Sequence, residues 1–141
     1  MARQLLITGC NRGIGRVAVG LFAEEGYDII CCIRGENPEF SKYAAELMRA
    51  NHVKIEMIYC DMMDENAIMS AFKPLLEERR HIDVLINNAG IAGKENDIGL
   101  VPTAYVHLFA GGGQPVGKLI VAHYCAVSSV CVSSVCVSSF F

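Results

Sequence analysis

The stretch "TGCNRGIG" at residues 8–15 follows the apolar run "QLLI" at residues 4–7 and contains three glycines. An apolar run that enters a glycine-rich turn predicts a buried strand followed directly by a helix. The first N–H groups of such a helix lack intrahelical partners, and together with the helix dipole they favour an anion. We assign Gly9 to the turn, Gly13 to a close approach of the backbone to a pyrophosphate, and Gly15 to helix–strand packing. For this spacing alone, a tight turn without a ligand is the alternative.

Length and composition limit the classes of function. The chain has 141 residues, of which 52% are hydrophobic, and this is enough for one core of ordinary domain size. Its formal net charge of -3 gives no broad basic surface, so we expect neither nucleic acid nor a membrane as a partner. The seven cysteines show no C-x-x-C spacing, and "MARQLL" does not resemble a signal peptide. We therefore expect a cytoplasmic protein with buried or incidental thiols, no disulfide framework and no metal site.

Short apolar runs alternate with stretches of helical spacing between residues 3 and 87. The runs lie at residues 4–8, 27–33, 53–60 and 82–87. Parallel strands need helical crossovers and are buried on both faces, so this order predicts an α/β fold with a Rossmann-like, doubly wound parallel sheet. The sheet is incomplete, with about four βα units. Ligands of such sheets bind at the carboxyl ends of the strands, where the glycine-rich loop lies.

Three helices are expected between these strands. Their predicted buried faces are Ile14, Val17, Ala18, Leu21 and Phe22 in the first, Phe40, Tyr43, Ala44, Leu47 and Met48 in the second, and Ile68, Ala71, Phe72, Leu75 and Leu76 in the third. Gly26 is the expected stop of the first helix. Asn37 and Asp64 are the expected N-caps of the second and third, and Pro38 suits a first helical position.

The glycine-rich loop and the tetrapeptide "NNAG" at residues 87–90 together resemble the short-chain dehydrogenase/reductase family. The resemblance covers residues 3 to about 93. It implies that the loop after the first strand binds a nicotinamide cofactor. The loop residues with this implied role are Thr8, Gly9, Asn11, Arg12, Gly13, Ile14 and Gly15.

Two further segments carry implied cofactor contacts. In this family the acid that matches Asp61 hydrogen-bonds the adenine, and Met62 is its neighbour over the ring. Residues Asn87 to Gly90 match the motif that steadies the fourth strand and lies along the cofactor's ribose, and Asn88, Ala89 and Gly90 are the members with an implied cofactor contact. From the residues alone, Asp61 or Asp64 could instead only cap the helix that follows, and Asn87 could be a polar strand end.

The preference for NAD(H) or NADP(H) depends on the residues at the end of the second predicted strand, in "CCIRGE". An Asp or Glu there would bind a ribose 2′-hydroxyl and repel a 2′-phosphate, but Ile33 stands at that place. Arg34 beside it can hold a phosphate bidentately, and Arg12 is similar to the basic residue of NADP-preferring members. Glu36 is a weaker opposing signal. We expect NADP(H) in preference to NAD(H), with solvated surface arginines as the alternative.

The catalytic Tyr-x-x-x-Lys of this family is absent from the sequence. Tyr105 is followed four residues later by Phe109, and Tyr124 by Ser128. We therefore assign no catalytic residue. The resemblance implies an oxidoreductase of the carbonyl or 3-oxoacyl-carrier-protein reductase type, acting on a small carbonyl or alcohol substrate. We expect this chain to be a truncated and inactive form that does not make the family-type homo-oligomer. A non-catalytic NADP-binding or interaction module is the alternative.

The composition changes after residue 97, which divides the chain into a dinucleotide-binding part at 1–97 and an uncharged tail at 98–141. From residue 98 onward the only formal charge is Lys118, and the pentad "VSSVC" at 127–131 repeats at 132–136. We expect this low-complexity tail to be frame-shifted or disordered. A splice or fusion product, a tail anchor from residues 119–141 and a β-prone adhesive segment are the alternatives.

Overall fold

A computed structural model describes residues 2–89, 118–127 and 130–138 of the chain. The strands are β1 (Gln4–Thr8), β2 (Asp28–Ile33), β3 (Ile55–Tyr59), β4 (Val84–Asn87), β5 (Lys118–Val127) and β6 (Val130–Ser138). The helices are α1 (Gly13–Glu24), α2 (Pro38–Asn51) and α3 (Glu65–Glu77). The first four strands and the three helices alternate in the predicted order, and each of these strands lies within its predicted apolar run.

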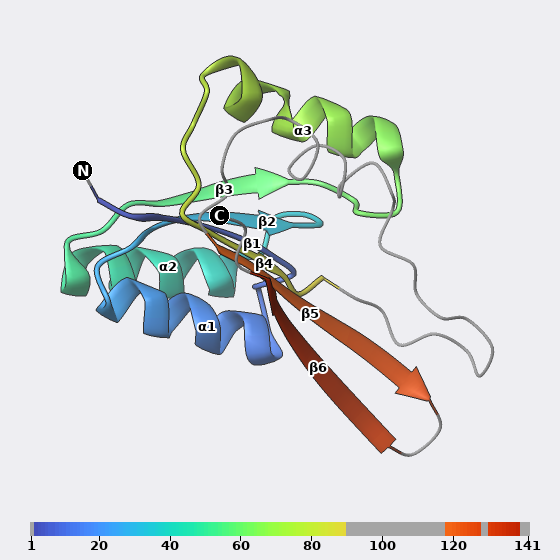
Figure 1. The fold of residues 1–141 in the computed structure, drawn as a ribbon. Coiled ribbons are helices and arrows are strands. Elements are labelled where there is room, and N and C mark those ends of the chain that lie inside the picture. The colour runs from blue at the N-terminus through green and yellow to red at the C-terminus, as the bar shows by residue number, and fades with distance from the viewer. Residues whose placement is uncertain (1, 90–117, 128–129, 139–141) are drawn as a thin grey trace.

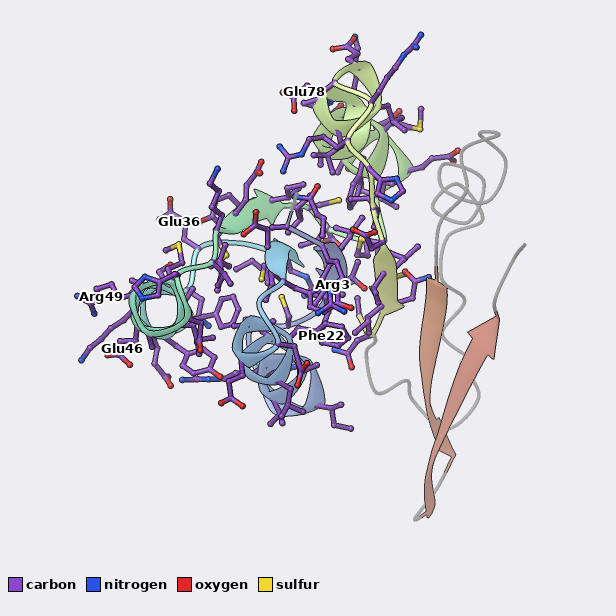
Figure 2. All side chains as sticks on the ribbon, turned by 60° about the vertical axis from the view of Figure 1, so that its left-hand side comes forward. Arg3, Phe22, Glu36, Glu46, Arg49 and Glu78 are labelled. Atoms are coloured by element: carbon purple, nitrogen blue, oxygen red, sulfur yellow. The ribbon has the colours of Figure 1, made fainter. Side chains whose placement is uncertain are left out.

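The four amino-terminal strands form a parallel sheet in the order β3-β2-β1-β4 (Figure 1). Helices α1 and α2 cover one face and α3 covers the other, as the second view also shows (Figure 2). Alternate residues of β2 serve the two cores: Cys31 packs on the side of α1 and α2, and Cys32 on the side of α3. This arrangement confirms the predicted Rossmann-like fold.

Two more strands extend the sheet beyond β4. The first four residues of β5 pair in parallel with β4, from Val84 opposite Lys118 to Asn87 opposite Val121. Strand β6 pairs antiparallel with the whole of β5 and lies at the end of the strand order. The hairpin therefore continues past β4 as a two-stranded ribbon (Figure 1). Valine-rich, uncharged segments favour such extended pairing. The expected frame shift or disorder of residues 98–141 stays a prediction.

The predicted buried face of α1 was wrong for three of its five residues. Ile14, Val17 and Leu21 are 52%, 62% and 58% exposed. The buried residues are Gly15, Val19, Gly20 and Ala23, with Ala18 and Phe22 partly buried beside them.

Close packing explains this difference. A Cβ added to Gly20 would lie 2.5 Å from the Tyr43 hydroxyl of α2, so α1 approaches its neighbour through a position without a side chain. Periodicity counts large apolar residues and therefore misses a face that is built on glycine and alanine.

The other two helices follow the sequence closely. In α2, Phe40 and Ala44 are buried, and Glu46 and Arg49 extend away from the sheet (Figure 2). In α3, the buried residues are Ile68, Phe72 and Leu75. Leu76 is an error of the predicted face, since it is 43% exposed one position beyond the buried stripe. Among the helices that the structure describes, none is both long and apolar enough to cross a membrane.

Candidate functional site

Three loops meet at the carboxyl ends of β1, β2 and β3. The Gly9 N–H donates to the Cys32 carbonyl at 2.8 Å, which fixes the glycine-rich loop beside the end of β2. The Cys60 N–H donates to the Ile33 carbonyl at 2.9 Å and fixes the end of β3 on the other side of β2. These two backbone bonds bring the glycine-rich loop, the Arg34 loop and the Asp61 loop to one edge of the sheet.

The glycine-rich loop contains two residues in the left-handed region, Gly9 with φ +65° and Gly13 with φ +56°. A Cβ at Gly9 would lie 2.6 Å from the Ala89 Cα, so the loop also packs closely on the segment after β4. At Gly13, by contrast, a Cβ would meet nothing within 4 Å, and the backbone there borders open space. Gly9 thus serves the turn and a close contact, and Gly13 supplies an accessible backbone.

Gly15 is tightly enclosed. A Cβ there would lie 2.5 Å from the Asn88 Nδ2 and 2.7 Å from the Gly9 carbonyl oxygen. The contacts of Gly15 are thus with the loop and with Asn88. Gly15 was predicted to allow close packing of the helix on the strand, and in the structure it also allows close packing on the segment after β4.

Thr8 and Asn88 connect the glycine-rich loop to the segment after β4. The Thr8 hydroxyl accepts from the backbone N–H groups of Asn88 at 3.2 Å and Ala89 at 3.0 Å. In return, the Asn88 side-chain amide donates to the carbonyls of Thr8 at 3.3 Å and Gly9 at 2.9 Å. Thr8 is only 1% exposed. The geometry therefore gives Thr8 and Asn88 a positioning role for the loop.

The N-terminus of α1 carries no side-chain cap. Its N-cap residue Arg12 makes no capping hydrogen bond, and the first turn has no acidic residue. The first N–H groups of α1 therefore combine a favourable dipole with donors that no capping side chain satisfies. Arg12 is exposed and Asn11 half-buried at this point.

The other two helices have the N-caps that the sequence predicted. The Asn37 side chain accepts from the Phe40 N–H at 2.9 Å. The Asp64 carboxylate accepts from the N–H groups of Asn66 at 2.9 Å and Ala67 at 3.2 Å. Asp64 is thus the cap of α3, and Asp61 is free of that role.

The end of β4 holds a buried polar atom that the predicted site residues did not include. The Asn87 side chain is 8% exposed, and within the described part of the chain its Oδ1 accepts no hydrogen bond. An unpaired buried acceptor is costly and marks a place for a donor. The residue pattern placed Asn87 in a motif, but only the packing reveals its unsatisfied oxygen. Gly90, the last residue of that motif, lies outside the described residues.

Arg34 and Asp61 face each other across the ends of β2 and β3. The Arg34 Nε lies 3.8 Å from the Asp61 Oδ2, and both side chains are largely solvent-accessible. The other carboxylate oxygen of Asp61 accepts from the Met63 N–H at 3.0 Å. Met62, the next residue, is half-buried and packs on the α3-side core. The structure thus brings together the residues expected at the adenosine end of a cofactor.

Four buried cysteines lie under the loops, and all four are free thiols. A hydrogen bond to Cys10, followed by burial, raises the pKa of Cys31. Burial raises the pKa of Cys32 and of Cys60. A raised pKa favours the neutral thiol at Cys31, Cys32 and Cys60. All four cysteines are buried and act as small core side chains, as predicted. In the residues that the structure describes, no cluster of three or more histidine, cysteine or acidic side chains could hold a metal ion.

The short chain dehydrogenase family model matches residues 3–109. The chain belongs to this family. Its members are oxidoreductases that act on small carbonyl or alcohol substrates and typically use NAD or NADP as cofactor. The match confirms the resemblance found from the glycine-rich loop and the "NNAG" motif. It includes Tyr105, which lies outside the described residues.

Individual relatives agree with this family. Over 92 residues the chain is 36% identical to sulfoacetaldehyde reductase 2 of Chromohalobacter salexigens, covering 65% of this chain and 35% of that protein. It is 33% identical over 91 residues to a 3-oxoacyl-acyl-carrier-protein reductase of Staphylococcus aureus, covering 64% and 37%. The chain thus spans about a third of the length of these curated relatives.

A solved structure shows the same fold. A short-chain dehydrogenase from Sphingobium yanoikuyae in complex with NADPH superposes with a TM-score of 0.56 at 30% identity. The match covers 65% of this chain and 35% of the dehydrogenase. That protein binds NADPH, as its description states.

Proposed function

We propose that this chain binds NADP(H) as the cofactor-binding part of an oxidoreductase of the carbonyl or 3-oxoacyl reductase type. The observation that carries the proposal is the N-terminus of α1. It is the one helix start of the described chain without a side-chain cap, and it lies beside the open backbone of Gly13. A phosphate group would satisfy its free N–H groups and interact favourably with the dipole.

The side chains and backbone groups at this edge of the sheet have the chemistry that such a cofactor requires. The α1 N-terminus with Asn11, Ile14 and Gly15 would hold the pyrophosphate. The donor that the buried Asn87 Oδ1 lacks could come from a ribose hydroxyl. Asp61 would accept from the adenine amino group, and Met62 would lie against its ring.

The 2′-phosphate of NADP would bind to Arg34, with Arg12 assisting. Both residues are exposed at the same edge of the sheet, and Ile33 before Arg34 is buried, so no carboxylate stands where a 2′-hydroxyl acceptor would be expected. The relative from Sphingobium yanoikuyae, which binds NADPH, supports this choice by analogy.

The bound nicotinamide would supply hydride transfer to or from a carbonyl carbon. Proton transfer to the substrate needs a general acid, and these 141 residues contain no Tyr-x-x-x-Lys. We therefore propose that the chain by itself binds the cofactor without turnover. NADPH oxidation with a ketone panel, above a control without protein, would contradict this inactivity.

A titration of the 141-residue chain tests the cofactor proposal. Adenosine 2′,5′-bisphosphate and 5′-AMP differ only in the 2′-phosphate, so calorimetry with both ligands isolates the contribution of Arg34. We expect Arg34→Ala to weaken the bisphosphate roughly tenfold to a hundredfold, the value of charge-assisted hydrogen bonds of about 1.5–3 kcal/mol. Binding of 5′-AMP should change little.

Arg49→Ala is the matched control, because it removes the same charge from the exposed side of α2. It should leave both affinities unchanged. Equal losses for both ligands in Arg34→Ala, or no binding of either ligand to the unmodified chain, would overturn the NADP assignment.

A further inference from the structure

We propose that Asp61 is a positioning residue for Arg34 and thereby helps to determine the preference for a 2′-phosphorylated nucleotide. The inference rests on the proposed function and assigns a second role to the same site. Its basis is the Asp61–Arg34 pair, in which a carboxylate on one loop faces a guanidinium on the next at 3.8 Å.

The Asp61 carboxylate is itself fixed before it meets Arg34. Its Oδ1 accepts from the Met63 N–H at 3.0 Å, and the Asp61 carbonyl accepts from the Asp64 N–H at 3.1 Å. These two bonds make a tight turn between β3 and α3. The second oxygen, Oδ2, is thus presented toward the Arg34 loop from a rigid support.

The loops that carry the pair are also held in place. The bond from the Cys60 N–H to the Ile33 carbonyl joins the residues immediately before Asp61 and Arg34. The backbone therefore sets the spacing of the two side chains, and the rotamer of Arg34 is the remaining conformational freedom of the pair. An arginine with a 68% exposed side chain has many rotamers, so a fixed charge beside it restricts where its guanidinium lies.

The contact leaves the phosphate-binding end of Arg34 accessible. It involves Nε, and no described residue accepts a hydrogen bond from the two terminal nitrogens of Arg34. A guanidinium that is held through Nε can still offer its terminal N–H groups to a phosphate. Ligands without a 2′-phosphate gain nothing from this arrangement. Asp61 would therefore increase the preference for nucleotides with a 2′-phosphate over those without one, in addition to binding the adenine.

Asp61 also repels a phosphate through its own charge, so the test must separate repulsion from positioning. A double-mutant cycle does this. Calorimetry on the full chain gives the ratio of the 5′-AMP to the adenosine 2′,5′-bisphosphate dissociation constant for the unmodified protein, Asp61→Asn, Arg34→Ala and the double variant. Asparagine keeps an Oδ1 acceptor for the Met63 N–H, so the turn is retained while the charge is removed.

In the Arg34→Ala background, Asp61→Asn changes only the repulsion and should leave the ratio unchanged or raise it. In the Arg34 protein the same substitution also frees the guanidinium. In each background, Asp61→Asn multiplies the ratio by some factor. We expect this factor to be roughly two- to fivefold smaller in the Arg34 protein than in the Arg34→Ala background, which is the size of an exposed ion-pair coupling. The coupling should shrink as the salt concentration rises.

Glu36→Gln is the charge-matched control. Glu36 is an exposed acid two residues after Arg34, and it forms no ion pair with any described residue. Its removal should not lower the ratio. The same effect of Asp61→Asn in both backgrounds would overturn the positioning role and leave the NADP proposal intact. Failure of the unmodified chain to prefer the bisphosphate would instead overturn the proposed function.

Discussion

The N-termini of α1 and α3 begin with the same backbone chemistry and satisfy it in opposite ways. At α3, Asp64 accepts from two N–H groups, and Glu65 places a second negative charge in the first turn. At α1 the side chain of Arg12 makes no capping bond, and no acid follows. The difference shows that helix formation here does not require a cap. Capping stabilises α3 as a structural element, whereas the first N–H groups of α1 have no capping side chain in the described part of the chain.

The glycines sharpen this comparison, because three glycines in different loops meet different constraints. Gly9 combines a left-handed φ with a close contact, Gly26 has a left-handed φ of +77° in open space, and Gly35 has neither constraint. We expect Gly9→Ala to cost about 2–4 kcal/mol of unfolding free energy, from backbone strain and overlap with Ala89. Gly26→Ala should cost about 1 kcal/mol and Gly35→Ala less than about 0.5 kcal/mol.

Urea unfolding of the three variants, followed by circular dichroism, measures these differences. Equal losses at Gly9 and Gly26 would mean that the close approach of the loop to Ala89 contributes nothing.

Removal of the caps should give the next largest effects. Asp64→Ala deletes an acceptor of two N–H groups and should destabilise the chain by about 1–2 kcal/mol. Asn37→Ala deletes an acceptor of one N–H group and should cost about 1 kcal/mol. Arg12→Ala removes no capping bond and should stay within about 0.5 kcal/mol. The same denaturation assay compares the three. A loss at Arg12 as large as that at Asp64 would contradict the description of α1 as uncapped.

The smallest effect is expected on the outward face of α1. Val17→Gln replaces an exposed residue and should change the unfolding free energy by less than about 0.5 kcal/mol. Val19→Ala, on the buried face of the same helix, is the matched contrast and should cost about 1–3 kcal/mol. If Val17→Gln is the more damaging of the two, the face predicted from periodicity would be the buried one after all.

The sequence predicted best what is determined locally. The four parallel strands are continuous apolar runs, and Asn37 and Asp64 are short polar residues directly before helical stripes, so both could be found without tertiary information. The buried face of α1 could not, because Gly15 and Gly20 are selected by contacts with Asn88 and Tyr43.

Some features of the candidate site could likewise be predicted from the sequence, and others depend on tertiary packing. Glycine positions and a family motif located its loops, since these follow from spacing along the chain. The contact between Arg34 and Asp61 depends on how the ends of β2 and β3 are aligned. The unpaired Asn87 Oδ1 likewise depends on packing around β4. Neither feature leaves a signal in residue order.

The contrast between helix N-termini can be observed residue by residue in a ¹⁵N-labelled sample of the 141-residue chain during titration with NADP⁺. We expect large chemical-shift changes for the amides of Gly13, Ile14 and Gly15, whose N–H groups would meet the pyrophosphate. The amides of Phe40 and Asn66, which the caps already occupy, should move little. Saturable binding that leaves the α1 amides unchanged, or that shifts all three helix starts equally, would contradict the proposal that α1 is the anion-binding helix.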